Sequence, residues 1–352
     1  MRSPALILSL PTLVALAPAL ASGYGEGDSA GPSLEERALH SQTDRARVEP
    51  GATDDAFASL PAVRPLVANA DLGDAARFYA DDMSQNDCFP ADHSSCDGTS
   101  YATRVDSFYA GRPIGENIAR GQPDAETAVF VSWLYSAGHR ANMLSASFDE
   151  FGGGHAAPGG PFWVQDFGFG GHEAALLTSG SHAPLQVDPS DAIEFITAFY
   201  DPEGAAPASV QLVIDTVCTP MEDDCGAPGA QTFVGSRSAP DEEGCLPYWF
   251  LAETAAGVEV AFPTTGSLLA PVGGATCAPF TIDRRGAECA PQGTGQFGGS
   301  GGGCGGSGAG YDPDANVGGN AEYGSCALAA KRQPAPIGWA LLLAAARLRR
   351  RR

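Results

Sequence analysis

Basic residues are scarce in this chain of 352 residues. Twenty Lys and Arg stand against 42 Asp and Glu, which gives a formal net charge of −22 at pH 7. A field of this sign repels phosphate groups, and no local cluster of basic residues precedes residue 326. We therefore expect neither nucleic acid nor anionic lipid headgroups as partners, and contact with a membrane only through the two ends of the chain.

Several catalytic and metal-binding motifs are also missing from the sequence. There is no CxxC or Cys/His spacing typical of a structural zinc site, and no GxSxG elbow accompanies Ser132, Ser136 and His139. The acidic run 222–224 lacks the spacing of a calcium-binding loop. These absences argue against a structural zinc site, a serine hydrolase and a calcium-loop protein.

The first 22 residues have the composition of a secretory signal peptide. Arg2 precedes an apolar run, and the small-residue series 19–22 follows it. An acidic, glycine-rich stretch begins directly afterwards, which disfavours the alternative of a short buried helix. We expect residues 1–22 to direct export.

The C-terminal end carries a second targeting pattern. Residues 333–346 are uncharged and lie between a Lys-Arg pair and an arginine-rich cluster at 347–352. This stretch is too short to span a bilayer. With Cys326 upstream, the layout resembles the C-terminal sorting tag of myxobacterial surface proteins, which implies cleavage near that cysteine and display on the cell surface at the outer membrane. A tail anchor that is left uncut is the alternative for residues 326–352.

Nine cysteines fit an oxidising compartment, in which disulfides persist. Cys88 and Cys96 are close enough in sequence to staple a single loop. If Cys326 belongs to the sorting tag, the remaining eight can pair completely, but the spacing leaves the connectivity of the other six open. These six are Cys218, Cys225, Cys245, Cys277, Cys289 and Cys304.

Three segments of the first half are predicted to be helical. Residues 33–48 carry apolar residues at helical spacing behind Ser33, a typical N-cap. Residues 71–85 place five apolar side chains on one stripe. A third helix should begin at Pro123 and end at Gly138, which can supply the left-handed residue after a helix.

Strands follow these helices rather than alternating with them. Two runs, 150–157 and 161–169, are separated by a Pro-Gly-Gly turn signal. Helices first and strands late predict an α+β sandwich rather than a doubly wound parallel sheet.

The second half of the chain has a different pattern of apolar and turn-forming residues. Residues 184–290 contain short alternating runs separated by Pro, Gly and Asp, which predicts a small, disulfide-stapled, all-β sandwich. Residues 291–325 are expected to form a linker, because 11 of the 18 residues from Gly293 to Gly310 are glycine.

A family resemblance is carried by five blocks in a fixed order. They are HSSCDG (93–98), GENI (115–118), WLYSAGHRANML (133–144), FDEFGGG (148–154) and FWVQDFG (162–168). These blocks resemble bacterial CAP domains, the fold of cysteine-rich secretory, venom antigen 5 and plant pathogenesis-related 1 proteins. The resemblance covers residues 32–171 and implies an α-β-α sandwich with an extracellular role in defence, toxicity or lipid binding.

Four residues in these blocks make the candidate site: His93, Glu116, His139 and Glu150. Two imidazoles and two carboxylates that converge on one cleft would suit Zn²⁺ or another divalent cation and leave a position for water. The resemblance implies such convergence, because CAP domains have a cavity lined by two His and two acidic residues. His93, Glu116 and His139 match the motif positions, whereas Glu150 follows the bacterial variant, which lacks the family's acid soon after the helix tryptophan.

A purely structural role is the alternative for these side chains. His139 is predicted to follow a helix C-terminus, where a cation favours the helix dipole. Glu116 could cap or bond a neighbouring loop.

Three functions remain open on the sequence alone. The leading hypothesis is an exported or surface-displayed CAP protein that binds a cation, lipid or peptide in this cavity without turnover. One rival is an extracellular metal-assisted hydrolase, with His93 and His139 as metal ligands and Glu116 as the base. The other is an adhesin whose β-sandwich binds glycan, with Tyr200, Tyr248 and Trp249 as its aromatic candidates.

Overall fold

A helix packed between two β-sheets connects the halves of this protein. The computed structural model describes residues 31–281, 283–284, 289, 322–323 and 327–328. The predicted signal peptide, Cys304 and Cys326 lie outside these residues. Among the described residues, none of the helices has the length and hydrophobicity that a membrane span requires.

The first two predicted helices are confirmed, with bounds within a residue or so of those expected. Helix α1 runs over Leu34–Val48, and Ser33 caps it in a capping box, in which its hydroxyl accepts from the Glu36 amide at 3.2 Å. Helix α2 runs over Ala70–Asn86 behind the N-cap Asn69. Two shorter helical segments are η1 (Asp55–Phe57) and α3 (Tyr101–Asp106).

The third predicted helix is wrong as a single element. The segment η2 (Thr127–Trp133) is a π-helix, and the Leu134 amide donates five residues back to the Val129 carbonyl at 2.9 Å. Ser136 then adopts an extended backbone and begins a separate short helix, α4 (Ala137–Met143). Gly138 therefore lies inside α4 instead of ending a helix. The break follows the π-type turn, which shifts the hydrogen-bond register at the point where Trp133 is fully buried.

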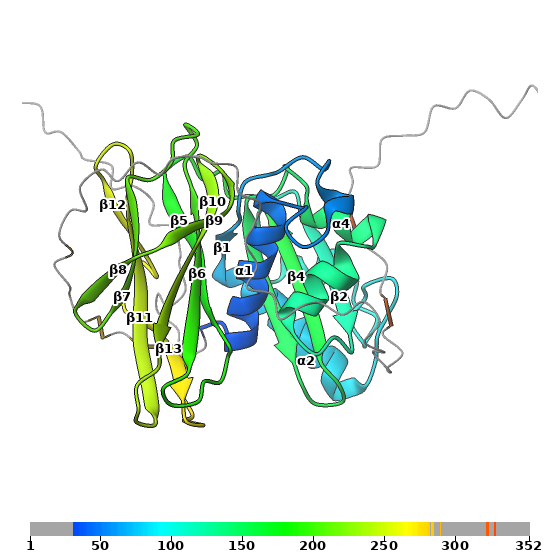
Figure 1. Ribbon diagram of the computed structural model, residues 1–352. Coiled ribbons are helices and arrows are strands. Elements are labelled where there is room, and N and C mark those ends of the chain that lie inside the picture. The colour runs from blue at the N-terminus through cyan, green and yellow to red at the C-terminus, as the bar shows by residue number, and fades with distance from the viewer. Residues whose placement is uncertain (1–30, 282, 285–288, 290–321, 324–326, 329–352) are drawn as a thin grey trace, which may run out of the picture.

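The first sheet is the middle layer of a three-layer sandwich (Figure 1). Its strands run in the order β1 (Val67–Ala68), β3 (Glu150–Ala156), β4 (Phe162–Gly168) and β2 (Gly115–Arg120). Helix α2 packs so closely on one face that a Cβ on Gly152 or Gly154 would come within 2.2 Å of its backbone. Helix α1 covers the other face. The predicted α-β-α arrangement is confirmed.

Two strands from the predicted linker and tag extend this sheet. Strands β15 (Glu322–Tyr323) and β16 (Ala327–Leu328) both pair antiparallel with the outer edge of β2. Ala327 lies opposite Glu116 in this pairing. The C-terminal part of the chain therefore returns to the candidate site, which the glycine-rich composition did not predict.

The second half forms the predicted β-sandwich. One sheet has the order β5 (Leu176–Ala183), β6 (Ala192–Tyr200), β10 (Ala230–Ser238), β9 (Glu222–Ala227). The other has the order β14 (Phe280–Thr281), β13 (Ser267–Val272), β11 (Gly244–Glu253), β7 (Ser209–Ile214), β8 (Val217–Pro220), and β12 (Glu259–Phe262) pairs with β11. A buried apolar cluster fills the space between them. The first strand begins at Leu176, ahead of the expected boundary at residue 184.

Helix α1 is buried on two sides because it also packs against β5. Asp44 of α1 bonds both to β5 and to Leu66, which precedes β1. The Asp44 carboxylate accepts from the Leu66 amide at 2.8 Å, from the Thr178 hydroxyl at 3.0 Å and from the Ser179 hydroxyl at 2.7 Å. Fully satisfied buried groups of this kind hold partners in one geometry. The two halves thus share α1 as a common layer.

Three disulfides are described, and Cys88–Cys96 confirms the predicted staple. The pairs Cys218–Cys289 and Cys245–Cys277 answer part of the connectivity that the spacing left open. Cys225 is disulfide-bonded as well.

Candidate functional site

The four predicted site residues are all buried, and they come from four different elements. Glu116 lies on β2 and Glu150 begins β3, whereas His139 belongs to α4. His93 lies in the loop that the Cys88–Cys96 disulfide closes. Their exposed fractions are 1% for His93, 0% for Glu116, 1% for His139 and 7% for Glu150.

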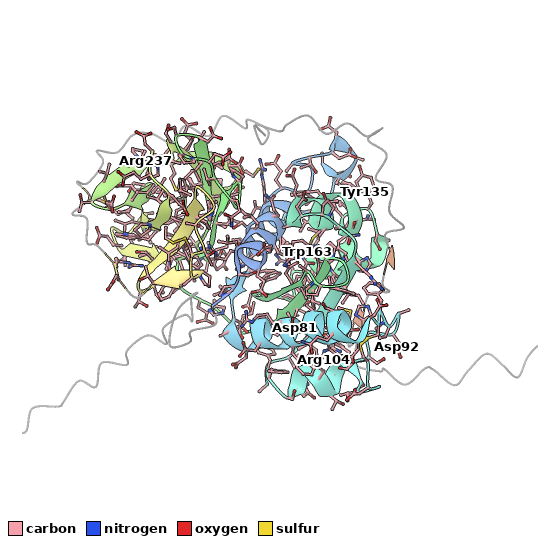
Figure 2. The ribbon with its side chains drawn as sticks, turned by 90° about the horizontal axis from the view of Figure 1, so that it is seen from below. Asp81, Asp92, Arg104, Tyr135, Trp163 and Arg237 are labelled. Atoms are coloured by element: carbon pink, nitrogen blue, oxygen red, sulfur yellow. A yellow bond between two sulfur atoms is a disulfide. The ribbon has the colours of Figure 1, made fainter. Side chains whose placement is uncertain are left out.

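His93 and Glu116 are in direct contact. The Nδ1 atom of His93 is 2.8 Å from Oε1 of Glu116, and Nη2 of Arg104 is 2.5 Å from Oε2. The Arg104 guanidinium lies 3.5 Å from the ring centre of Tyr79 on α2. Both carboxylate oxygens of Glu116 are therefore paired, and its charge is balanced inside the protein. In Figure 2, Arg104 lies beside α2, and Asp92 lies next to the disulfide.

The backbone at His93 is held in an uncommon conformation. Its φ of 62° lies in the left-handed region, which few residues other than glycine adopt. The His93 amide donates to the Pro90 carbonyl at 3.0 Å, and the His93 carbonyl accepts from Nη1 of Arg104 at 3.0 Å. Its Nε2 atom is buried and has no hydrogen-bond partner among the described residues. Strain and a buried polar atom without a partner both occur at binding sites.

A fifth residue, Asp166, completes the charged cluster and was missed at the sequence level. It lies on β4 directly opposite Glu116 in the antiparallel pairing with β2 and is fully buried. Burial, together with the neighbouring Glu116 carboxylate, raises the pKa of Asp166 well above its ordinary range. The Arg104 cation therefore compensates the charge of Glu116 and also lies close enough to Asp166 to favour its ionised form. The FWVQDFG block contains Asp166, but only the strand register shows that it faces Glu116.

Helix α4 is tied to β2 by two asparagines of the quoted blocks. Asn117 donates to the His139 carbonyl at 3.1 Å, and Asn142 donates to the Glu116 carbonyl at 2.9 Å. His139 is the third residue of α4. It therefore lies in the first turn of a helix, and the expected placement after a helix C-terminus is wrong.

Glu150 has partners of its own. Its carboxylate accepts from the Tyr109 hydroxyl at 2.6 Å and lies 3.1 Å from Nε2 of His172. Burial raises the pKa of Glu150, but the hydrogen bonds from His172 and Tyr109 outweigh it and lower that pKa overall. Neither Tyr109 nor His172 was singled out from the sequence, because no motif marks them.

The described residues do not form a ready-made zinc site around His93. A structural or catalytic zinc ion takes at least three protein ligands. Among the described residues, the His, Cys and acidic donors that lie within 4.8 Å of one another are Asp82, Cys88 and Cys96, and the two sulfurs are joined in a disulfide. His93 and Glu116 supply two donors, and Arg104 already compensates the carboxylate. The donor set therefore does not fit a zinc ion in this conformation.

The aromatic candidates of the β-sandwich have three different environments. Tyr248 is fully buried in its core, so it is not an exposed platform. Tyr200 is half-buried, and the Arg64 guanidinium lies 3.8 Å from its ring centre. Trp249 lines a pocket on the outer face of the second sheet of the sandwich.

Comparisons with known proteins match part of the first half of the chain to one family. Residues 59–167 match the family described as CAP: Cysteine-rich secretory protein family. Uncharacterized protein YkwD of Bacillus subtilis (strain 168) is 35% identical over 106 residues, which make up 30% of this chain and 40% of that protein. The chain therefore spans about two fifths of the length of this curated relative.

Solved structures of similar proteins include one bacterial protein described as extracellular and one described as an outer surface protein. One is an extracellular protein containing a SCP domain from Bacillus anthracis, with 26% identity, coverage of 36% of this chain and 43% of that chain, and a TM-score of 0.28. The other is an outer surface protein from Borrelia burgdorferi, with 20% identity, coverage of 37% and 88%, and a TM-score of 0.30. The family match and the similarity to the Bacillus subtilis protein, rather than these structures, confirm the CAP resemblance, and the family match spans residues 59–167.

Proposed function

We propose that this chain is exported and acts outside the cell as a CAP-domain protein that binds a small ligand at His93 without turning it over. The observation that carries the proposal is the buried Nε2 atom of His93, which has no partner among the described residues although the rest of its ring and backbone is fixed. A buried polar atom costs free energy unless something pairs with it. A ligand group that donates to or accepts from Nε2 would recover that cost.

Export is supported by the cysteine chemistry. Disulfides persist in oxidising compartments and are rare in the cytosol of mesophiles, and this protein has three described pairs. The signal peptide at 1–22 and the sorting tag at 326–352 remain predictions. Mass spectrometry of the N-terminus and C-terminus of the protein isolated from its native cells tests both, and a cytoplasmic product that retains residues 1–22 would contradict export.

The pairing of Glu116 favours binding over hydrolysis. A general base must be able to accept a proton from a bound water within hydrogen-bond reach. His93 and Arg104 occupy both carboxylate oxygens of Glu116. In this conformation the carboxylate is a structural anion that orients His93, so we place the hydrolase second.

The test compares matched histidine variants of the full chain, produced in an oxidising host compartment. His93→Asn removes the imidazole, and asparagine tolerates the left-handed backbone at this position. His155→Asn is the control, because His155 is a partly buried histidine on β3 whose ring packs at a tilt against Trp163, with 4.3 Å between the ring centroids. Native mass spectrometry identifies the small molecules that copurify with each protein, and calorimetric titration with zinc chloride serves as the negative test, because the donors around His93 do not fit a zinc ion in this conformation.

We expect wild type and His155→Asn to bind the same ligand, and His93→Asn to lose at least about tenfold in affinity, the effect of about 1.4 kcal/mol. Equal binding by His93→Asn would contradict the proposal. Ester, peptide or cell-wall hydrolysis that disappears in both His93→Asn and Glu116→Gln would establish the hydrolase instead.

A further inference from the structure

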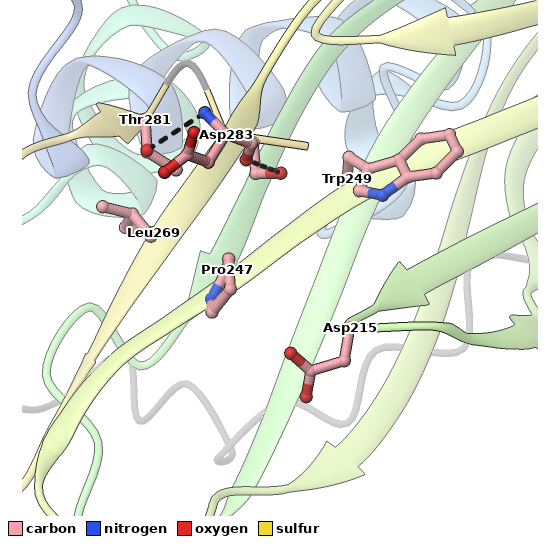
Figure 3. A pocket seen from close by; sticks show the side chains of 7 residues that line it. Asp215, Pro247, Trp249, Leu269, Thr281 and Asp283 are labelled. Atoms are coloured by element: carbon pink, nitrogen blue, oxygen red, sulfur yellow. Dashed lines mark hydrogen bonds between the residues drawn. The ribbon is translucent and has the colours of Figure 1, made fainter. Parts of the chain in front are cut away.

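A pocket of about 220 Å³ lies on the β-sandwich and is lined by residues of that half of the chain (Figure 3). Its volume is below the range of pockets that hold drug-sized molecules, so it suits one small ring or the end of a chain. Five different side-chain chemistries meet in it: carboxylate, indole, hydroxyl, proline ring and aliphatic. The lining residues used below are Asp215, Pro247, Trp249, Leu269, Thr281 and Asp283.

The strand alternation places this pocket on the outer face of its sheet. Tyr248 and Phe250 of β11 point into the sandwich core, so Pro247 and Trp249 point outward. Leu268 of β13 is likewise in the core, and its neighbours face out. Trp249 therefore has no role in the core between the two sheets.

The rim of the pocket is held by covalent and hydrogen bonds. Thr281 and Asp283 lie between Cys277 and Cys289 in the sequence, and disulfides join these cysteines to Cys245 on β11 and Cys218 on β8 of the same sheet. The Asp283 amide donates to the Thr281 hydroxyl at 3.3 Å. A pocket whose walls are fixed before binding loses less conformational entropy when a ligand enters.

Trp249 contributes an unused donor to this pocket. Only 7% of the residue is exposed, and its indole nitrogen is buried without a hydrogen-bond partner among the described residues. The Arg284 guanidinium lies 4.4 Å from the ring centre and so covers one face of the ring. Figure 3 shows the nitrogen-bearing edge of the ring on the side of Asp215. Buried indole N–H groups usually have a partner, so this edge indicates a position for a ligand acceptor.

The combination of groups selects the chemistry of the ligand. Asp215 and Asp283 accept hydrogen bonds, the indole N–H of Trp249 only donates, and Pro247 and Leu269 offer apolar contact. An alkylammonium group would pair with the carboxylates but cannot accept from the indole. A hydroxyl group both donates and accepts, and a pyranose ring carries several hydroxyls around an apolar body.

We infer that this pocket binds the terminal pyranose ring of a neutral glycan. The inference does not depend on the His93 site and would give the protein a second, independent binding surface. The Trp249 edge donates to one sugar hydroxyl, and the two carboxylates accept from others. A single-ring pocket predicts weak affinity for a monosaccharide and stronger binding to a multivalent glycan surface.

The test uses saturation-transfer-difference NMR on the full chain. Glucose, galactose, mannose and N-acetylglucosamine are the neutral probes, and n-butylamine is the cationic probe. Trp249→Phe removes the indole N–H and keeps an aromatic ring, and Asp283→Ala removes one acceptor. Asp188→Ala is the matched control, because Asp188 is an exposed aspartate of the same sandwich outside the pocket.

We expect at least one pyranose to bind, with affinity about three- to tenfold lower for Trp249→Phe and for Asp283→Ala and unchanged for Asp188→Ala. Thermal unfolding of each variant separates loss of binding from loss of folding, and Thr281→Val supplies a further pocket variant if Trp249→Phe fails to fold. Binding of n-butylamine without any sugar, sugar binding that is equal in all variants, or no binding of any sugar would overturn the inference.

Discussion

Replacing Arg104 with methionine tests whether one buried cation holds the candidate site together. Arg104 is 3% exposed, pairs with Glu116 at 2.5 Å, and bonds the His93 carbonyl at 3.0 Å. Arg104→Met keeps much of the apolar stem and removes the charge. The Glu116 carboxylate would then be buried beside Asp166 without a cation.

Removal of one partner from a buried ion pair costs about 3–5 kcal/mol, because the other charge stays desolvated. Loss of the guanidinium from the face of Tyr79, 3.5 Å from its ring centre, adds about 1–2 kcal/mol. We therefore expect Arg104→Met to lower the free energy of unfolding by at least about 4 kcal/mol, a large share of the roughly 5–15 kcal/mol typical of a folded protein.

Removing the negative charge with Glu116→Gln should lower the free energy of unfolding less than Arg104→Met does. Burial and then Glu116 are the main causes that raise the pKa of Asp166, and Arg104 opposes them. In Glu116→Gln the charge of Glu116 is gone, so Asp166 can ionise and pair with Arg104. The double variant Arg104→Met/Glu116→Gln should lose less stability than the sum of the two single losses, because neither leaves an uncompensated charge once both are changed.

Urea unfolding of the four proteins at pH 7, followed by circular dichroism, measures these differences. A loss below about 1 kcal/mol for Arg104→Met, or strict additivity in the double variant, would refute the reasoning. In that case the contacts around Glu116 would orient the side chains of the site without adding appreciably to the free energy of unfolding.

Three further predictions concern α1 and the His93 loop. Asp44→Ala leaves the buried Leu66 amide and the hydroxyls of Thr178 and Ser179 on β5 without this acceptor, so we expect urea unfolding to show a loss of about 3 kcal/mol or more, and a loss under about 1 kcal/mol would contradict this. Burial raises the pKa of Glu36 from 4.5 to about 7, so the folded state holds a proton that the unfolded state releases between these values. The unfolding free energy should therefore fall by about 3 kcal/mol as the pH rises through this window, and Glu36→Gln should remove that component in a pH series. Cys88→Ser/Cys96→Ser opens the loop around His93, and calorimetry should show the free energy of unfolding lowered by about 2–3 kcal/mol. An unchanged free energy of unfolding would contradict this and would mean that hydrogen bonds alone fix the loop.

Local sequence signals determined the elements of this fold well. The capping residue Ser33 and the apolar stripe of residues 71–85 located α1 and α2, because both depend on side chains within a few residues. The turn between residues 156 and 162 separated β3 from β4 for the same reason. The interrupted helix around Ser136 was not predictable in this way, since a π-type turn keeps the same apolar pattern as an α-helix over a short span.

The family blocks marked the candidate site residues, and the tertiary structure decided which of them are in contact. The sequence placed His93, Glu116 and Glu150 in one candidate set. In the folded protein His93 contacts Glu116, whereas Glu150 accepts a hydrogen bond from Tyr109. No signal in the sequence indicated that Asp166 belongs to the site, because only the register of β2 against β4 places it opposite Glu116.

Disulfide pairing shows the same division. Cys88 and Cys96 were predictable as partners because they are separated by only 8 positions, whereas Cys218 and Cys289 are 71 positions apart. Contacts of the first kind are set by chain length and local geometry, and the sequence determined them alone. Contacts of the second kind, including the pocket around Trp249, depend on how whole sheets pack, because many distant residues together fix the register and the faces that meet.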